Sequence, residues 1–207
     1  MADHLHTLDR ARATSGPRRF QAAAIRASDM TASAIGIVAT APLVAAAALV
    51  VRLDSPGPAL FRQARVGRGE RPFICYKLRT MADGTRVAGT HEVSAASVTS
   101  VGRWLRRLKI DELPQLWNVL RGEMSLVGPR PCLPSQIQLI EERRARCVYQ
   151  VRPGITGRAQ VAGMDMSTPV ELAIEDAVWA QAPNMGDYIR LVLLTIVGKG
   201  QGDAIRD

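Results

Sequence analysis

The sequence predicts an α+β fold that is mostly helical, with a re-entrant membrane helix-break-helix, a small cytoplasmic domain with a short β-hairpin, and amphipathic interfacial helices. An uncharged run of 22 residues, positions 30–51, reaches the length that a membrane helix needs. Beyond it, two short strand-like segments precede several segments with apolar residues at helical spacing. We therefore expect three parts: a basic N-terminal arm over 1–28, a membrane segment over 29–52 and a folded domain over 53–207.

The N-terminal arm is rich in arginine and has few apolar residues before its end, so we expect it to be flexible. The membrane segment that follows has Pro42 near its middle, which cannot donate a hydrogen bond to the carbonyl of Val38. Basic residues crowd both flanks, which favours the cytoplasmic side for both ends. Each half of the run reaches about 15–18 Å at ~1.5 Å per residue, half of a ~30 Å hydrocarbon core. These facts favour a segment that enters and leaves the same leaflet, with a kinked span as the alternative.

A β-hairpin is expected next, from two strand-like segments over 59–67 and 71–81 that a glycine-containing turn separates. Residues 82–99 are rich in Gly, Thr, Ser and Ala and predict a loop. Amphipathic helices are expected over 101–108 and 113–120. Their tryptophans beside arginines fit either the surface of an anionic membrane or packing into a core. Further helices are expected over 133–147, with its charged residues solvated, and over 170–180 and 188–197.

The charge of the chain limits the classes of partner that we expect for it. A net charge of +8 and a pI near 10.2 indicate nucleic acid, an anionic membrane or a phosphorylated substrate. Only 4% of residues are aromatic and none form a stripe among lysines and arginines, so we expect no nucleic acid partner. Three scattered cysteines indicate a reducing compartment and neither a disulfide framework nor a thiolate metal site.

Candidate chemistry lies in two neighbouring motifs. Asp111 and Glu112 are adjacent at the expected start of a helix, where negative charge is favoured and where Pro114 suits the first turn. We expect Asp111 to be ionised and exposed. Arg130 follows within a Gly-Pro-Arg-Pro turn, and Arg152 lies in an Arg-Pro-Gly turn whose guanidinium can bind a phosphate. This pattern predicts a carboxylate nucleophile beside a phosphate clamp.

Taken together, these motifs resemble the small monotopic phosphoglycosyl transferases of bacteria, the bacterial sugar transferase family. The resemblance extends over about residues 29–197 and implies an enzyme of the bacterial inner membrane, with its catalytic domain on the cytoplasmic face. Such an enzyme transfers a sugar-1-phosphate from a UDP-sugar to a polyprenol phosphate, usually undecaprenol phosphate. The segments that carry it are the run broken at Pro42, Tyr-Lys-Leu-Arg-Thr-Met at 76–81, Asp-Glu-Leu-Pro-Gln at 111–115, Gly-Pro-Arg-Pro at 128–131 and Val-Arg-Pro-Gly-Ile-Thr-Gly at 151–157.

The resemblance also implies roles for single residues. Asp111 would attack the phosphate that carries the sugar, forming a covalent phosphosugar intermediate and releasing UMP. Mg²⁺ next to Asp111 would screen the charge repulsion of that attack, and Glu112 would orient the metal or the acceptor phosphate. Arg106 would hold the backbone near the membrane break. The clamps for phosphate oxygens would be Lys77, Arg79, Arg130 and Arg152.

Two positions depart from the pattern of many relatives. Ala41 replaces the serine before the proline of the break, and Arg158 replaces a tryptophan after Ile-Thr-Gly.

Membrane lipids are expected partners of the protein, and a homodimer is an open alternative to a monomer. The product would initiate exopolysaccharide, capsule, O-antigen or glycoconjugate synthesis. The competing hypothesis is a non-catalytic membrane-surface protein that binds anionic lipid or nucleotide through the same basic turns.

Overall fold

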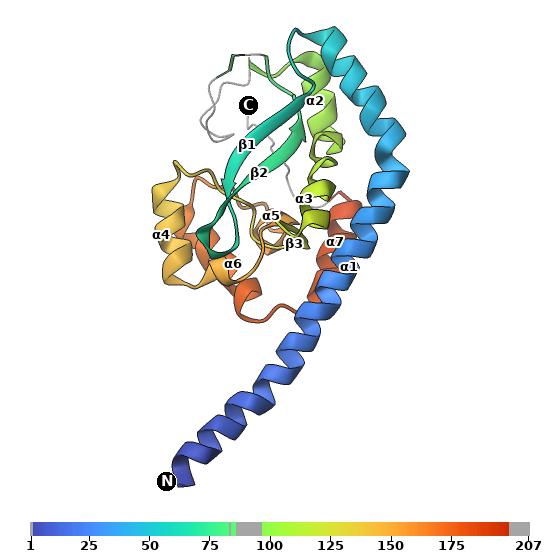
Figure 1. The fold of residues 1–207 in the computed structure, drawn as a ribbon. Coiled ribbons are helices and arrows are strands. Elements are labelled where there is room, and N and C mark those ends of the chain that lie inside the picture. Colours follow the sequence, from blue (N-terminus) through green and yellow to red (C-terminus); the bar gives the residue numbers. More distant parts are fainter. Residues whose placement is uncertain (1, 83, 86–96, 199–207) are drawn as a thin grey trace.

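The computed structural model describes residues 2–82, 84–85 and 97–198, with side chains from residue 19 onward. One long helix runs along the outside of a small mixed domain (Figure 1). The loop predicted over 82–99 lies mostly outside the described residues. The overall class, mostly helical with a small hairpin, agrees with the sequence-based prediction.

The long helix α1 spans Ala2–Asp54 without interruption, so the break expected at Pro42 is not present. The helix instead curves in the half that contains Pro42 (Figure 1). A helix can absorb a proline by bending, because only one hydrogen bond is lost. The hydroxyl of Thr40 donates to the carbonyl oxygen of Gly36 at 2.7 Å, a contact that also favours bending. The predicted basic arm and membrane segment are therefore parts of one helix. The prediction that this segment enters and leaves the same leaflet stays a prediction.

The predicted hairpin is confirmed. Strands β1 (Leu60–Val66) and β2 (Pro72–Leu78) are antiparallel, with Phe61 opposite Lys77. Gly69 in the connection has a φ of +63°, a conformation that glycine adopts without strain. A second, unpredicted pair joins β3 (Ser125–Val127) to β4 (Gly154–Thr156) in parallel.

The expected helices are all found, with shifted ends. Thr99 caps the first of them by accepting a hydrogen bond from the backbone N–H of Gly102. The helices after α1 are α2 (Ser100–Arg107), α3 (Gln115–Arg121), α4 (Ile137–Ala145), the short α5 (Arg158–Val161), α6 (Pro169–Gln181) and α7 (Met185–Ile196).

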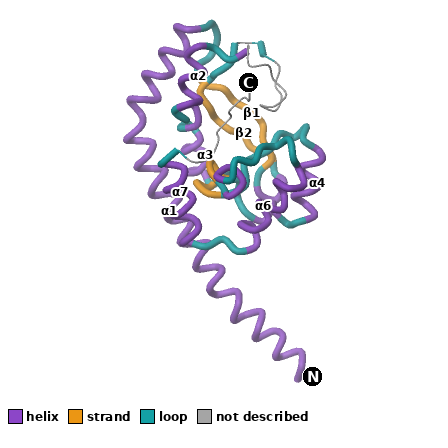
Figure 2. Tube along the Cα trace, turned by 180° about the vertical axis from the view of Figure 1, so that it is seen from behind, coloured by secondary structure: helices purple, strands orange, loops and turns teal. Residues whose placement is uncertain are grey.

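Helix α1 lies along α3 and α7, as the two opposite views show (Figures 1 and 2). Near its middle, Ile25 packs into a core cluster with Trp179 and Tyr188. Near its C-terminal end, Ala47 and Val51 pack into a second cluster with other elements of the domain. The helix therefore enters the core at two separated places and packs along α3 between them.

The outer face of α1 is apolar and open. Val38 and Leu53 are 77% and 78% exposed. Among the described residues, one helix, over Arg19–Asp54, is long and apolar enough to cross a membrane. On α2, Leu105 is buried in the core while Trp104 is exposed, so packing into a core is confirmed for one face and membrane contact of the other face stays a prediction. The apolar surface therefore continues from α1 onto the domain.

Candidate active site

Asp111 and Glu112 lie in a 3₁₀ turn, Ile110–Glu112, between α2 and α3. Lys109 reverses the chain before the turn with a φ of +56°, and Pro114 precedes the start of α3. The turn packs against β2 and α2, and Asp111 is only 3% exposed. The expectation of an exposed Asp111 is therefore wrong, because the turn is covered by the hairpin and the preceding helix.

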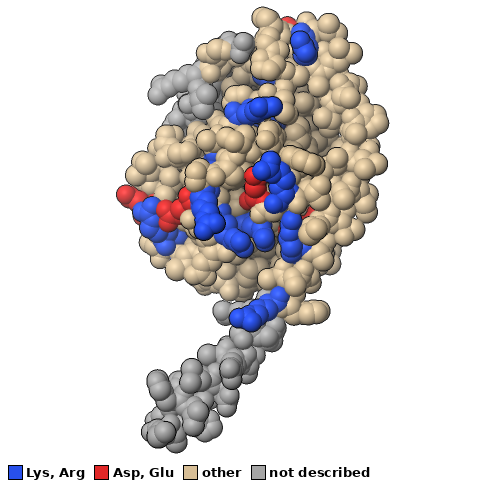
Figure 3. Space-filling view, in the orientation of Figure 1, with Lys and Arg blue, Asp and Glu red and all other residues tan. Residues whose placement is uncertain are grey.

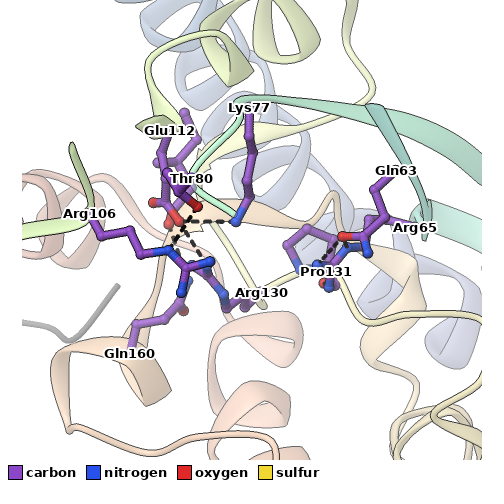
Figure 4. A network of polar contacts seen from close by, with 10 residues as sticks. Gln63, Arg65, Lys77, Thr80, Arg106, Glu112, Arg130, Pro131 and Gln160 are labelled. Atoms are coloured by element: carbon purple, nitrogen blue, oxygen red, sulfur yellow. Dashed lines mark hydrogen bonds and ion pairs between the residues drawn. The ribbon is translucent and has the colours of Figure 1, made fainter. Parts of the chain in front are cut away.

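The carboxylate of Glu112 is bound by two cations. Its Oε1 accepts a hydrogen bond from Nη2 of Arg130 at 2.7 Å and lies 3.4 Å from Nζ of Lys77 (Figure 4). All three side chains are largely buried. Charge-assisted contacts of this kind are strong where water is excluded. The structure thus brings together three of the predicted site residues, from β2, the 3₁₀ turn and the Gly-Pro-Arg-Pro turn.

Arg106 also belongs to this cluster. Its Nε donates to the hydroxyl of Thr80 at 2.9 Å, and its guanidinium lies beside Glu112 and Arg130 (Figure 4). The role implied by the resemblance, holding the backbone near Pro42, stays a prediction. The structure thus adds Arg106, in the last turn of α2, to the cluster around Glu112.

Arg79 lies away from this cluster. Its guanidinium donates to the carbonyl oxygens of Pro56 and Ser55, both at 2.6 Å, and to that of Val51 at 3.3 Å. The carbonyls of Ser55 and Pro56 lie just beyond α1, whereas that of Val51 also accepts from the backbone N–H of Ser55 at 3.3 Å. Its contacts in this structure therefore fasten the C-terminal end of the long helix.

Arg152 lies near the far end of α3. Its Nε donates to the carbonyl oxygen of Gly122 at 2.8 Å. Burial, and then the neighbouring charges of Arg68 and Arg26, lower the pKa of Arg152. Since α3 separates Gly122 from Glu112, the structure does not bring Arg152 to the Glu112 cluster.

A cavity of about 520 Å³ opens beside Glu112 and Arg130. Its far wall comes from β4, α5 and α7, where the hydroxyls of Thr156 and Thr195 lie 2.6 Å apart. Gln160 on the same wall has a buried Oε1 with no hydrogen-bond partner. Lysine and arginine side chains gather on the face shown in Figure 3, with acidic ones between them. The cavity therefore combines apolar walls with a cationic edge, which suits a phosphorylated ligand.

Mg²⁺ takes oxygen ligands, so Asp111 and Glu112 are the side chains of this cluster that could hold it. Among the described residues, no group of three or more His, Cys, Asp and Glu side chains could hold a metal ion. Mg²⁺ is often held by one or two carboxylates, with substrate phosphates and water as its remaining ligands. The adjacent carboxylates of Asp111 and Glu112 fit this mode, with Asp111 as the ligand that the sequence predicted.

These features define a protein with an exposed apolar helix and a cavity beside two adjacent carboxylates, one of which is paired with two cations. The sequence profile described as bacterial sugar transferase matches residues 20–198. The chain therefore belongs to the bacterial sugar transferase family, as the sequence resemblance indicated.

Curated relatives agree with this assignment. The chain is 46% identical over 183 residues to a UDP-glucose:undecaprenyl-phosphate glucose-1-phosphate transferase of Caulobacter vibrioides, a match that covers 83% of this chain and 67% of the relative. It is 44% identical over 184 residues to an undecaprenyl-phosphate glucose phosphotransferase of Komagataeibacter xylinus, covering 83% of this chain and 35% of that protein. It is 40% identical over 163 residues to a UDP-N-acetylgalactosamine-undecaprenyl-phosphate N-acetylgalactosaminephosphotransferase of Aeromonas hydrophila, covering 77% and 38%. The chain thus spans between about a third and two thirds of these relatives.

Proposed function

We propose that this protein is a phosphoglycosyl transferase that moves a sugar-1-phosphate from a UDP-sugar to undecaprenol phosphate. The observation that carries the proposal is the cluster in which Arg130 and Lys77 bind Glu112, next to Asp111, at the edge of the cavity. The names of the three relatives, which describe undecaprenyl-phosphate sugar phosphotransferases, support the same reaction.

The chemistry that we propose begins at Asp111. A carboxylate oxygen of Asp111 attacks the phosphorus that bears the sugar, a P–O bond to the other phosphate breaks, and UMP leaves with that bridging oxygen. A phosphate oxygen of undecaprenol phosphate then attacks the same phosphorus, and the Asp111 carboxylate is released. Mg²⁺, when bound, supplies positive charge that screens the repulsion between carboxylate and diphosphate.

Arg130 and Lys77 would bind the diphosphate of the donor. In the structure their charges are directed at one carboxylate oxygen of Glu112, which holds both near the cavity (Figure 4). A bound diphosphate offers them further oxygens at the same place. Glu112 would therefore keep the two cations oriented before the substrate arrives, in addition to orienting the metal or the acceptor phosphate.

The membrane arrangement that we propose places α1 in the bacterial inner membrane and the domain on its cytoplasmic face. The exposed apolar side chains of α1 and of α2 support lipid contact. A cysteine introduced at position 5 distinguishes the two arrangements of this helix. Labelling only from the cytoplasmic side supports the re-entrant arrangement, and labelling from the periplasmic side contradicts it.

The test of function is UMP release. Purified protein in nanodiscs is incubated with Mg²⁺, undecaprenol phosphate and a panel of UDP-sugars, as wild type and as Asp111→Asn. Release by the wild type, reduced on the order of a thousandfold or more in the variant, supports the proposal and identifies the sugar. Glu142→Gln, a carboxylate change on the surface of α4, is the matched control and should keep wild-type release. Nucleotide binding without release with any donor favours the non-catalytic alternative.

A further inference from the structure

The backbone of the turn that carries Arg130 is held at four consecutive carbonyl groups. Two donors are backbone N–H groups and two are arginine side chains that come from the hairpin and from α4. The bonds run from Gly154 N to Pro129 O at 2.9 Å, from Arg143 Nη1 to Arg130 O at 2.9 Å, from Arg65 Nη1 to Pro131 O at 2.9 Å, and from Val66 N to Cys132 O at 3.0 Å.

This pattern follows from the sequence of the turn. Pro129 and Pro131 flank Arg130 and have no backbone N–H, so they offer only carbonyl oxygens for hydrogen bonding. The peptide planes on either side of Arg130 are therefore fixed by hydrogen-bond donors from other elements, which bind the carbonyl oxygens of the turn. The side chain of Arg130 leaves the backbone between these planes, so their orientation sets its direction toward Glu112.

Arg143 is the least expected of these donors. The charged residues of its helix were predicted to be solvated, yet Arg143 is only 2% exposed. Asp176 on α6, also 2% exposed, accepts from its Nε at 2.9 Å and from its Nη2 at 2.6 Å. Burying an arginine is costly unless its charge is paired and its donors are used. The pairing with Asp176 compensates the charge and leaves Nη1 directed at the carbonyl of Arg130.

We propose that Arg143, held by Asp176, is a positioning residue that aims the Arg130 side chain at the diphosphate of the donor. The proposal rests on the proposed function. Rotation of the peptide after Arg130 would displace the guanidinium from its 2.7 Å contact with Glu112. A displacement of about 1 Å at a substrate-binding group can cost on the order of a hundredfold in rate.

The test uses variants of the full chain in nanodiscs. Arg143→Met combined with Asp176→Leu removes both buried charges, a change that buried ion pairs often tolerate without loss of stability. Arg143→Lys keeps the charge opposite Asp176 but lacks the planar fork that reaches the carbonyl of Arg130 as well. We expect both to raise KM for the UDP-sugar by about tenfold or more, with the thermal unfolding midpoint of the double variant within a few degrees of wild type.

A double-mutant cycle separates positioning from a general structural role. If Arg143 acts through Arg130, the Arg143 variants should have no further effect on KM or kcat in an Arg130→Gln background. Arg144→Gln, whose ion pair with Glu70 lies on the surface, is the matched control and should keep both constants. Wild-type constants in a folded Arg143 variant, or effects that add to those of Arg130→Gln, would overturn the proposal.

Two further measurements keep the test decisive. If the double variant does not fold, Arg143→Lys and Arg65→Met decide, because each removes one carbonyl contact of the turn without leaving a buried carboxylate alone.

If the wild type releases no UMP, the proposed function fails, and the same cycle is run on UDP affinity by titration calorimetry. A loss of UDP affinity that disappears in the Arg130→Gln background still supports positioning, and unchanged affinity contradicts it.

Discussion

The phenol of Tyr188 donates a hydrogen bond to Oδ1 of Asp29 at 2.9 Å and so connects α7 to α1. The same oxygen accepts from the hydroxyl of Ser125 at 3.0 Å and from the backbone N–H of Leu126 at 2.9 Å. Asp29 is 1% exposed, so these contacts are made away from water. The long helix is thus joined through one carboxylate oxygen to the strand that leads into the Arg130 turn.

Replacing Asp29 should reveal this junction. Asp29→Leu leaves three buried donors without an acceptor and should lower the free energy of unfolding by about 3 kcal/mol. Asp29→Asn keeps the accepting oxygen, and its amide replaces Oδ2, which has no partner, so we expect a smaller loss. Denaturant unfolding in detergent measures both. Equal losses for the two variants would show that the charge, and not the shared oxygen, makes the junction.

Arg79 provides a test of where the phosphate clamps lie. Because its guanidinium binds carbonyls at the end of α1, Arg79→Met should destabilise the protein by about 2 kcal/mol while KM for the UDP-sugar stays at the wild-type value. Unfolding and steady-state UMP release are measured on the same preparation. A raised KM with unchanged stability would instead restore Arg79 to the clamp that the sequence predicted.

Gly154 should not tolerate a side chain. A Cβ there would lie 2.1 Å from the backbone nitrogen of Gly128 and 2.5 Å from the carbonyl oxygen of Thr156. Gly154→Ala should therefore separate β3 from β4 and cost about 3 kcal/mol, with loss of UMP release. Gly36→Ala is the control, because its Cβ would meet the flexible end of Leu116 at 3.0 Å and because alanine favours a helix. Similar losses for both variants would contradict the expected tight approach of the two strands.

The three cysteines should react at different rates. Cys147 is exposed, whereas Cys75 and Cys132 are buried. Burial raises the pKa of the Cys75 thiol, so less thiolate is present there at neutral pH and alkylation needs a higher pH or local opening. Maleimide labelling followed by mass spectrometry should modify Cys147 first. Early labelling of Cys75 would show that the hairpin opens in solution.

The elements of the fold that could be predicted from the sequence are mostly those long enough to show a pattern of apolar residues. The hairpin and the helices α2, α3, α4, α6 and α7 were predicted from the sequence, whereas the four-residue helix α5 was not. The β3–β4 pair was missed because three-residue strands are too short to show a period of two. The uninterrupted α1 was missed because a proline marks a disturbance in a helix but does not say whether the chain bends or breaks.

The site was predicted less completely. Lys77, Glu112 and Arg130 do meet, but the burial of Asp111 depends on which elements cover its turn, and local sequence does not report that. The buried position of Arg143 was missed because a run of charged residues is usually solvated, and its partner Asp176 lies 33 residues away. Only the tertiary arrangement shows that one charge of the run faces inward.

The attachment of α1 at two places has a consequence for how the enzyme would meet its lipid. Asp29 fastens the helix to β3 and α7, and Arg79 fastens its C-terminal end to the hairpin. In the membrane arrangement that we propose, a bilayer that holds the segment between them would also set the height of Asp111 above the lipid headgroups. The distance from Asp111 to the lipid acceptor would then depend on how deeply one helix is immersed, so the reaction rate would depend on bilayer thickness.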